Sequence, residues 1–188
     1  MTRRATPSQT VGPFFSIGFS WLERTDLTEG IVDGPRVTVR GRVLDGDGQP
    51  VPDAVLEIWQ ADAHGRYRPE TDRGPTAPAS FLGFGRVPVS DAGEFCFTTI
   101  KPGRVDGANG LQQAPHLAIS IFMRGLLKRL VTRVYFPDEP SNNSDPVFGS
   151  VPIARRPTLL ARAVDAEGKN LLWDVHLQGD HETVFFDC

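Results

Sequence analysis

Apolar and polar residues alternate along most of this chain in short runs with the two-residue period of β-strands. Residues 37–43 and 51–61 show the pattern clearly, since Leu56 and Ile58 fall on one side of the run and Glu57 on the other. Similar runs follow at residues 84–90, 94–100, 116–123, 126–136, 171–178 and 182–186. About eight short strands at intervals of about ten residues, without a helix-length amphipathic run, predict an all-β sandwich or barrel.

Turn-forming residues between these runs predict how the strands connect. Asp45-Gly46-Asp47-Gly48 tolerates a tight chain reversal, so residues 37–43 and 51–61 are expected to form a hairpin or lie close to one. The other expected strand pairs are 84–90 with 94–100, and 116–123 with 126–136.

Two long stretches rich in proline and polar residues, 62–82 and 137–152, are expected to be loops. Loops of such length in a compact domain are usually functional. Residues 158–164 suit a helical turn or a strand equally well. No repeat interrupts the pattern, so residues 1–188 are expected to form a single β-sandwich domain with long loops and little helix.

The first 30 residues combine structure-breaking residues with large apolar side chains. A terminal segment stays ordered only where it packs against another surface. The apolar side chains of this segment are Phe14, Phe15, Ile17, Phe19, Trp21 and Leu22. We therefore expect residues 1–30 to dock onto a protein surface rather than to fray.

Composition and charge narrow the class of protein. The 188 residues carry a formal net charge of -3, which argues against a nucleic-acid surface and against a polybasic membrane anchor. No run approaches the ~18 apolar residues of a membrane-spanning helix. Two cysteines, Cys96 and Cys188, favour a reduced, cytoplasmic setting over a disulfide framework. Arg3-Arg4 suits a twin-arginine export signal, but the residues that follow do not form its apolar core.

His116 and Tyr67 have side chains suited to metal binding. His116 begins the run at 116–123, where residues two apart share a face of the strand, so His116 and Ala118 point the same way. Two imidazoles at such positions, with a distant tyrosinate, would suit a ferric ion, but only one imidazole is present. Both His116 and Tyr67 also suit ordinary structural roles, and the residues alone leave this open.

Other catalytic motifs are absent from the sequence. It contains no Gly-x-Ser-x-Gly, no glycine-rich phosphate loop and no Cys-x-x-Cys. Hydrolase, nucleotide-binding and zinc-binding functions therefore have no motif to support them.

Several motifs, spread in one order over nearly the whole chain, resemble those of the intradiol ring-cleavage dioxygenases. They are Gly-Arg-Val-Leu-Asp-Gly-Asp-Gly-Gln-Pro-Val (41–51), Leu-Glu-Ile-Trp-Gln-Ala-Asp (56–62), Gly-Arg-Tyr (65–67), Asp-Ala-Gly-Glu-Phe (91–95), Ile-Lys-Pro-Gly (100–103) and Pro-His (115–116). The resemblance implies a β-sandwich of the intradiol dioxygenase type.

In this family two tyrosines and two histidines hold a ferric ion. The resemblance places one tyrosine at Tyr67 and one histidine at His116, while the other two positions hold Val105 and Ala118. Neither Val105 nor Ala118 can donate an electron pair from its side chain to a metal. An arginine expected three residues before the first histidine is replaced by Gln113. We call Tyr67, Val105, His116 and Ala118 the half-site.

The resemblance therefore implies the α, non-iron subunit of an enzyme built from two homologous subunits. A β subunit would hold Fe(III) in an αβ hetero-oligomer, and residues 1–30 of this chain would dock on it. The complex would use O2 to cleave 3,4-dihydroxybenzoate to 3-carboxy-cis,cis-muconate. This chain would hold no metal and no catalytic residue of its own. By position, its contributions to the substrate pocket would be Thr10, Gly12, Pro13, Phe14 and Arg133.

Two other interpretations stay open at this point. A sandwich without a ligand set of its own also suits a non-catalytic module that binds carbohydrate or protein. A self-sufficient dioxygenase would need an unusual ligand set drawn from His64, His176 or Tyr135.

Overall fold

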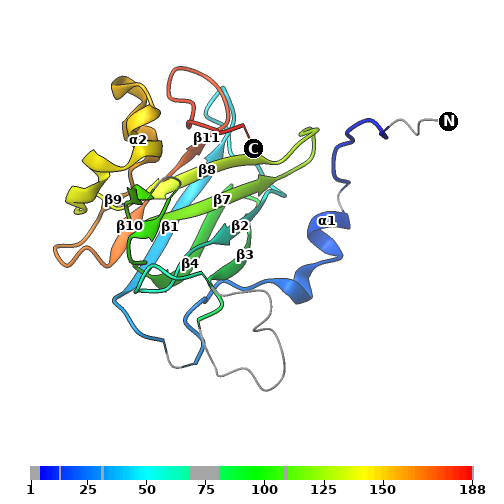
Figure 1. Ribbon diagram of the computed structural model, residues 1–188. Helices are drawn as coiled ribbons and strands as arrows, with labels where there is room; N and C mark the ends of the chain where they lie inside the picture. The colour runs from blue at the N-terminus through cyan, green and yellow to red at the C-terminus, as the bar shows by residue number, and fades with distance from the viewer. Residues whose placement is uncertain (1–4, 13, 31, 68–80, 108–109, 188) are drawn as a thin grey trace.

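The computed structural model describes residues 5–12, 14–30, 32–67, 81–107 and 110–187. Its strands form two main sheets and a short ribbon (Figure 1). The five-stranded sheet contains β1 (Arg36–Leu44), β4 (Glu94–Ile100), β9 (Arg162–Ala163), β10 (Asn170–Leu172) and β11 (Val175–His176). The four-stranded sheet has the order β3 (Phe84–Pro88), β2 (Val55–Trp59), β7 (His116–Phe122), β8 (Leu130–Tyr135). The ribbon pairs β5 (Val105–Asp106) with β6 (Gln112–Gln113).

Strand β1 lies inside the five-stranded sheet and has partners on both sides. It pairs antiparallel with β4 along residues 36–42, and parallel with β10 and then β11 on its other edge. Gly41 permits this arrangement, because a Cβ there would overlap the backbone carbonyl of Trp173. Trp173 also donates its backbone N–H to Arg40.

The two sheets pack face to face, and the side chains between them form the core. Alternation along β7 buries Leu117, Ile119 and Ile121, which join Val39 and Phe97 of the five-stranded sheet in one cluster. Burying an apolar side chain of this size stabilises the fold by about 2 kcal/mol. The predicted all-β sandwich is confirmed.

Helices are short and lie outside the sandwich. In the described ranges they include α1 (Phe14–Ile17), η1 (Ser20–Leu22), η4 (Pro140–Ser144), α2 (Pro146–Ser150) and η5 (Ile153–Leu159). Asp145 caps α2 by accepting hydrogen bonds from the backbone of Val147 and Phe148, both at 2.8 Å. A second apolar cluster forms beneath α2 and η5 around Tyr135, Phe148 and Leu159.

The expected pair 84–90 with 94–100 is wrong, and the pair 37–43 with 51–61 is limited to the residues next to the turn, where Leu44 forms an antiparallel bridge with Pro50. Both turns carry the chain from one sheet to the other. The turn at 45–48 forms, with Gly48 at φ 74°, but β1 and β2 belong to different sheets. The same holds for β3 and β4 across the turn at 91–93. Both edges of β1 are occupied, which leaves no place for β2. The third expected pair, β7 with β8, is confirmed.

The C-terminal region also differs from the prediction. Residues 158–164 divide between the end of η5 and β9, and the run at 171–178 divides into β10 and β11. The expected strand at 182–186 does not form. Instead, Thr183 donates its backbone N–H to His176 of one sheet, and Phe186 donates to Val131 of the other. Because this segment divides its backbone hydrogen bonds between the two sheets, it does not add a regular strand to either.

Within the described ranges, no helix has the length and apolar character needed to cross a membrane. Cys96 is exposed on β4 and carries a free thiol.

Candidate functional site on the outer face of the four-stranded sheet

Two half-site positions, His116 and Ala118, lie on the face of the four-stranded sheet that points away from the core. Residues opposite one another on neighbouring strands share a face, and the pairing aligns His116 with Tyr135 in one row. The next row contains Phe84, Trp59, Ala118 and Arg133. The sheet therefore places His116 and Ala118 side by side, as their spacing predicts, and brings Arg133 against Ala118.

His116 is held as a neutral imidazole. It is buried, and its Nδ1 lies 2.7 Å from the carbonyl oxygen of Ala114, so Nδ1 carries the proton and Nε2 keeps its lone pair. The pKa of His116 is lowered to about 4, first by burial and then by the positive charge of Arg133, against the opposing effects of the Ala114 hydrogen bond and of Asp145. The imidazole is thus in the state that metal ligation requires.

Tyr67 lies against the same face, because its ring stacks on Trp59 with centroids 5.8 Å apart. Its loop is held by Asp62, which accepts backbone hydrogen bonds from His64 and Arg66. Burial raises the pKa of the Tyr67 hydroxyl, while the charge of Arg133 lowers it. Burial is the larger cause, so Tyr67 is a neutral phenol at pH 7.

Two glycines of the motifs allow this loop to approach β5. A side chain at Gly65, whose φ is +78°, would overlap the backbone of Arg104. Gly103 is also too close to the loop for a side chain, since a Cβ there would come 2.5 Å from the carbonyl oxygen of Ala63. Gly103 also donates its N–H to Asp62 at 2.9 Å. Only glycine fits at either position, which explains why these motifs bring the loop that carries Tyr67 against the chain just before β5.

Half-buried Arg133 and buried Tyr135 form a hydrogen-bonded polar group beside His116. Arg133 Nη1 donates to Gln113 Oε1 at 2.6 Å and to the hydroxyl of Tyr135 at 3.4 Å. Tyr135 donates in turn to Asp145 Oδ1 at 3.3 Å. Burial raises the pKa of Tyr135 to about 12, with Arg133 lowering it and Asp145 raising it. Asp145 also accepts the backbone N–H of Ala114 at 2.7 Å, which fixes the chain just before His116.

The two substituted positions of the half-site contribute only hydrocarbon. Val105 is buried in β5 opposite Gln113, and Ala118 lies between Trp59 and Arg133 in their row. Across the part of the chain that the structure describes, no three His, Cys, Asp or Glu side chains gather into a possible metal site.

The residues of the alternative ligand set lie apart from the half-site or are otherwise engaged. His64 is exposed, with its Nε2 3.0 Å from Asp33. His176 belongs to the other sheet, where its ring lies 6.2 Å from that of His181. Tyr135 alone contacts the half-site, through His116.

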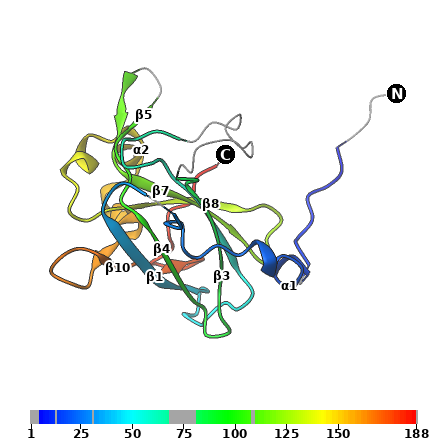
Figure 2. The same cartoon turned by 90° about the horizontal axis from the view of Figure 1, so that it is seen from below.

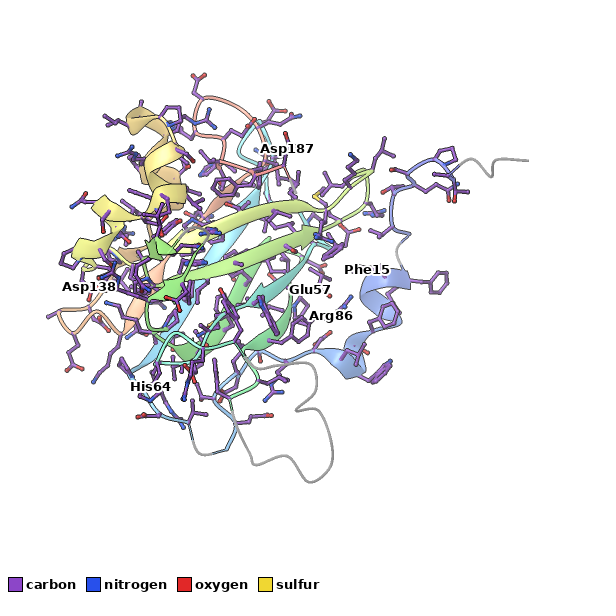
Figure 3. All side chains as sticks on the ribbon, viewed as in Figure 1. Phe15, Glu57, His64, Arg86, Asp138 and Asp187 are labelled. Atoms are coloured by element: carbon purple, nitrogen blue, oxygen red, sulfur yellow. The ribbon has the colours of Figure 1, made fainter. Side chains whose placement is uncertain are left out.

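At the other end of the same sheet face lies the N-terminal segment. Both views place α1 beside edge strand β3 (Figures 1 and 2). Phe15 packs on Phe122 at the end of β7, with centroids 5.2 Å apart. The guanidinium of Arg86 lies 4.6 Å from the ring of Phe15 and 5.2 Å from that of Phe19. Its Nη1 pairs with Glu57 at 2.8 Å, and Figure 3 shows these side chains between the sheet and α1.

The N-terminal segment thus docks in part on its own sheet, while much of its apolar surface stays exposed. Leu27 is buried in the core, and Arg24 bonds through its backbone to Arg86. Phe14, Ile17 and Trp21 are 77%, 69% and 76% exposed. Of the other proposed pocket residues, Thr10 accepts the backbone N–H of Gly125, Gly12 is exposed, and Pro13 lies outside the described residues.

Sequence reasoning missed two residues that organise this face, Asp145 and Arg86. The order Asp145-Pro146 is a recognisable helix start and could have identified the cap. Nothing local signals the contact of Asp145 with Tyr135, or that of Arg86 with Phe15.

Comparison with known proteins identifies the class to which this fold and face belong. A family model described as "Dioxygenase" matches residues 12–179, and the chain belongs to this family, the intradiol dioxygenases. The protocatechuate 3,4-dioxygenase alpha chain of Burkholderia cepacia is 40% identical over 200 residues, covering 99% of this chain and 98% of that protein. The beta chain from the same organism is 40% identical over 146 residues, covering 73% of this chain and 62% of its own length.

A solved structure agrees with this assignment. The dioxygenase domain of a dioxygenase carbohydrate-binding protein fusion from Streptomyces sp. SirexAA-E superposes with a TM-score of 0.65 at 28% identity. The match covers 84% of this chain and 88% of that one.

The family uses iron, but the residues of this chain do not suit a ferric ion. Tyr67 and His116 offer two donors where a stable site needs more, and Val105 and Ala118 add none. The remaining space beside Ala118 is next to a guanidinium, which cannot act as a ligand.

Proposed function

We propose that this chain is the alpha, non-iron subunit of a protocatechuate 3,4-dioxygenase. The observation that carries the proposal is the half-site itself, in which the frame around Tyr67 and His116 is intact while Val105 and Ala118 replace the other two donors. The similarity to an alpha chain over nearly the full length supports it.

In this proposal a homologous beta subunit supplies Fe(III), and the complex inserts both atoms of O2 into 3,4-dihydroxybenzoate. The bond between the two hydroxyl-bearing carbons breaks, and 3-carboxy-cis,cis-muconate is released. This chain shapes the pocket and the assembly. The cytoplasmic location expected from the cysteine content stays a prediction.

We propose that the beta subunit docks on the N-terminal segment, residues 1–30. We also propose that residues 1–188, including this segment, form a single domain. Its exposed apolar side chains Phe14, Ile17 and Trp21 are the kind that form the centre of protein interfaces. Thr10, Gly12, Pro13 and Phe14 would then form part of the pocket wall.

Arg133 completes the proposed contribution to the pocket. It is half-buried on the outer face of the sheet, and a guanidinium can orient a substrate carboxylate through charge-assisted hydrogen bonds.

Iron content and visible absorption of this chain, purified alone and then with its candidate beta chain, test the non-iron role. We expect a colourless, iron-free chain alone, and colour with ring-cleaving activity only in the complex. A chain that alone binds about one iron and shows a tyrosinate-to-iron band would overturn the proposal.

Trp21→Ser tests the docking surface. It should weaken the affinity for the beta chain by about 2 kcal/mol, roughly 30-fold, with unchanged stability of the isolated chain. Ile153→Ser is the matched control, because Ile153 is 78% exposed but lies in η5, on the far side of the sandwich from α1 (Figure 1). Equal effects of the two substitutions on the affinity would contradict the assignment of this surface.

A further inference from the structure

We infer that Arg133 is the resident cation of the half-site, and that its guanidinium would keep a metal ion out even if the two missing donors were restored. The inference deepens the proposed non-iron role and rests on it. It differs from the simpler explanation, in which the losses at Val105 and Ala118 are sufficient to exclude iron.

The position of Arg133 is the first observation. It is the cross-strand partner of Ala118 on β8, on the same face of the sheet, and side chains directly opposite in this way have Cβ atoms about 5 Å apart. A histidine at position 118 would therefore reach toward the same space as the side chain of Arg133. The methyl group of Ala118 leaves that space to the arginine.

The guanidinium is also held in place. Its Nη1 is bound at 2.6 Å by Gln113, which is the register partner of Val105 in the β5–β6 ribbon. The same nitrogen contacts Tyr135, whose own register partner is His116. Arg133 is thus bound to the register partners of Val105 and His116, and it is itself the register partner of Ala118.

The charge of Arg133 is not cancelled by these contacts. The two oxygens that bind it, from Gln113 and Tyr135, are neutral, and Asp145 is reached only through the Tyr135 hydroxyl. Its field acts on Tyr67, His116 and Tyr135 together, since each of these groups is shifted by the same positive charge. A ferric ion between Tyr67 and His116 would meet this uncancelled charge beside a buried imidazole.

The decisive experiment restores the donors with and without the arginine. Three forms of the full chain are compared, each coexpressed with the beta chain: V105Y/A118H, V105Y/A118H/R133M and V105Y/A118H/R133K. Methionine keeps the length of the side chain without charge, while lysine keeps the charge. Iron per αβ pair is counted as the increment over the wild-type complex, with the tyrosinate-to-iron band as a second readout.

We expect no added iron in the double variant or in the lysine variant. The methionine variant should take up about one further iron per pair, with ferric affinity at least about 100-fold higher than in the double variant. Iron uptake by V105Y/A118H equal to that of the methionine variant would overturn the inference. So would a folded methionine variant that takes up no more iron than the double variant.

A second set of variants covers the case in which the tyrosine at position 105 disrupts the buried ribbon. A118H, A118H/R133M and A118H/R133K retain Val105 and offer three donors for titration with cobalt(II). Cobalt(II) absorption that appears in A118H/R133M at a cobalt(II) concentration at least about tenfold lower than in the other two variants supports the inference. Equal titration curves for the three variants overturn it. Iron in the wild-type chain would instead refute the proposed function, so the two failures are distinguishable.

Discussion

The two ends of the outer face of the four-stranded sheet are held in different ways. At the His116 end, buried hydrogen bonds join β6, β7, β8 and the start of α2 through Asp145 and Tyr135. At the Phe122 end, the N-terminal segment is held by Arg86 and its aromatic contacts. Within the described residues, the second guanidinium nitrogen of Arg86, Nη2, is buried without a hydrogen-bond partner.

The residues that surround a metal site can therefore keep their positions without the metal. The His116 end keeps its geometry because the hydrogen bonds that position it do not pass through a metal. The Phe122 end is incomplete in another sense, since it leaves large apolar side chains in water. We call the His116 end the closed end, because its polar groups are bonded within this chain. We call the Phe122 end the open end, because its exposed apolar side chains suit contact with a partner protein.

The largest expected loss of stability follows from removing the carboxylate of Asp145 at the closed end. Asp145→Ala leaves the backbone N–H groups of Ala114, Val147 and Phe148 without their acceptor and should lower the free energy of unfolding by about 4 kcal/mol, measured by urea denaturation. Asp138→Ala is the control. It removes a 2.9 Å ion pair with Lys101 whose carboxylate is mostly exposed, and it should cost less than about 1 kcal/mol.

Asp145→Asn separates the contribution of the α2 cap from that of the contact with Ala114. The amide oxygen can still cap α2, but the amide nitrogen would face the N–H of Ala114, so a loss of about 2 kcal/mol is expected. A loss as large as that of the alanine variant would mean that the Ala114 contact dominates.

Lowering the pH should lower the free energy of unfolding through the protonation of His116. Its pKa in the folded chain is about 4, below the ~6.5 of the unfolded chain, so on acidification the unfolded state gains a proton first. This contribution is fully present above pH 6.5 and is lost as the pH falls to about 4, amounting to about 3 kcal/mol.

The difference between wild type and His116→Gln isolates the effect, because carboxylate titrations cancel in it. Glutamine can still donate to the Ala114 carbonyl but does not titrate near these pH values. The stability difference between the two proteins should shrink from pH 7 to pH 4. A difference that does not change with pH would show that His116 takes up a proton as readily in the folded chain as in the unfolded one.

The smallest effect concerns the open end. Arg86→Met removes the pair with Glu57 and the cation–π contacts, and it should lower stability by about 2 kcal/mol and speed proteolysis within residues 14–22. Glu57→Gln, which keeps the guanidinium over the rings, should leave proteolysis nearly unchanged. Equal cleavage in wild type and Arg86→Met would assign the docking to Phe15 on Phe122 instead.

Sequence patterns predicted what depends on neighbouring residues. The two-residue period of β7 predicted that His116 and Ala118 share a face, and the Gly-Arg-Tyr motif placed Tyr67 near them. The turns at 45–48 and 91–93 were also correct as turns, but their flanking strands part into opposite sheets. Whether a reversal keeps both strands in one ladder depends on the distant strands that already occupy its edges, which no local pattern contains.

The contacts of the half-site illustrate the same limit. Arg133 meets Ala118 only because β7 and β8 pair in one particular register. A shift of one residue would turn Arg133 into the core. Asp145 reaches Tyr135 across a loop whose path follows from packing beneath α2.

The interior position of β1 affects how the chain is made as well as how it is built. Residues 38–40 and 43–44 pair with residues 170–172 and 175–176, which are synthesised about 7 to 26 seconds later at ~5–20 residues per second. During that time β1 has one unpaired edge in the nascent chain, open to pairing with another strand. Strands β10 and β11 are synthesised long after β1, so a chain truncated before residue 170 would leave one edge of β1 without these partners.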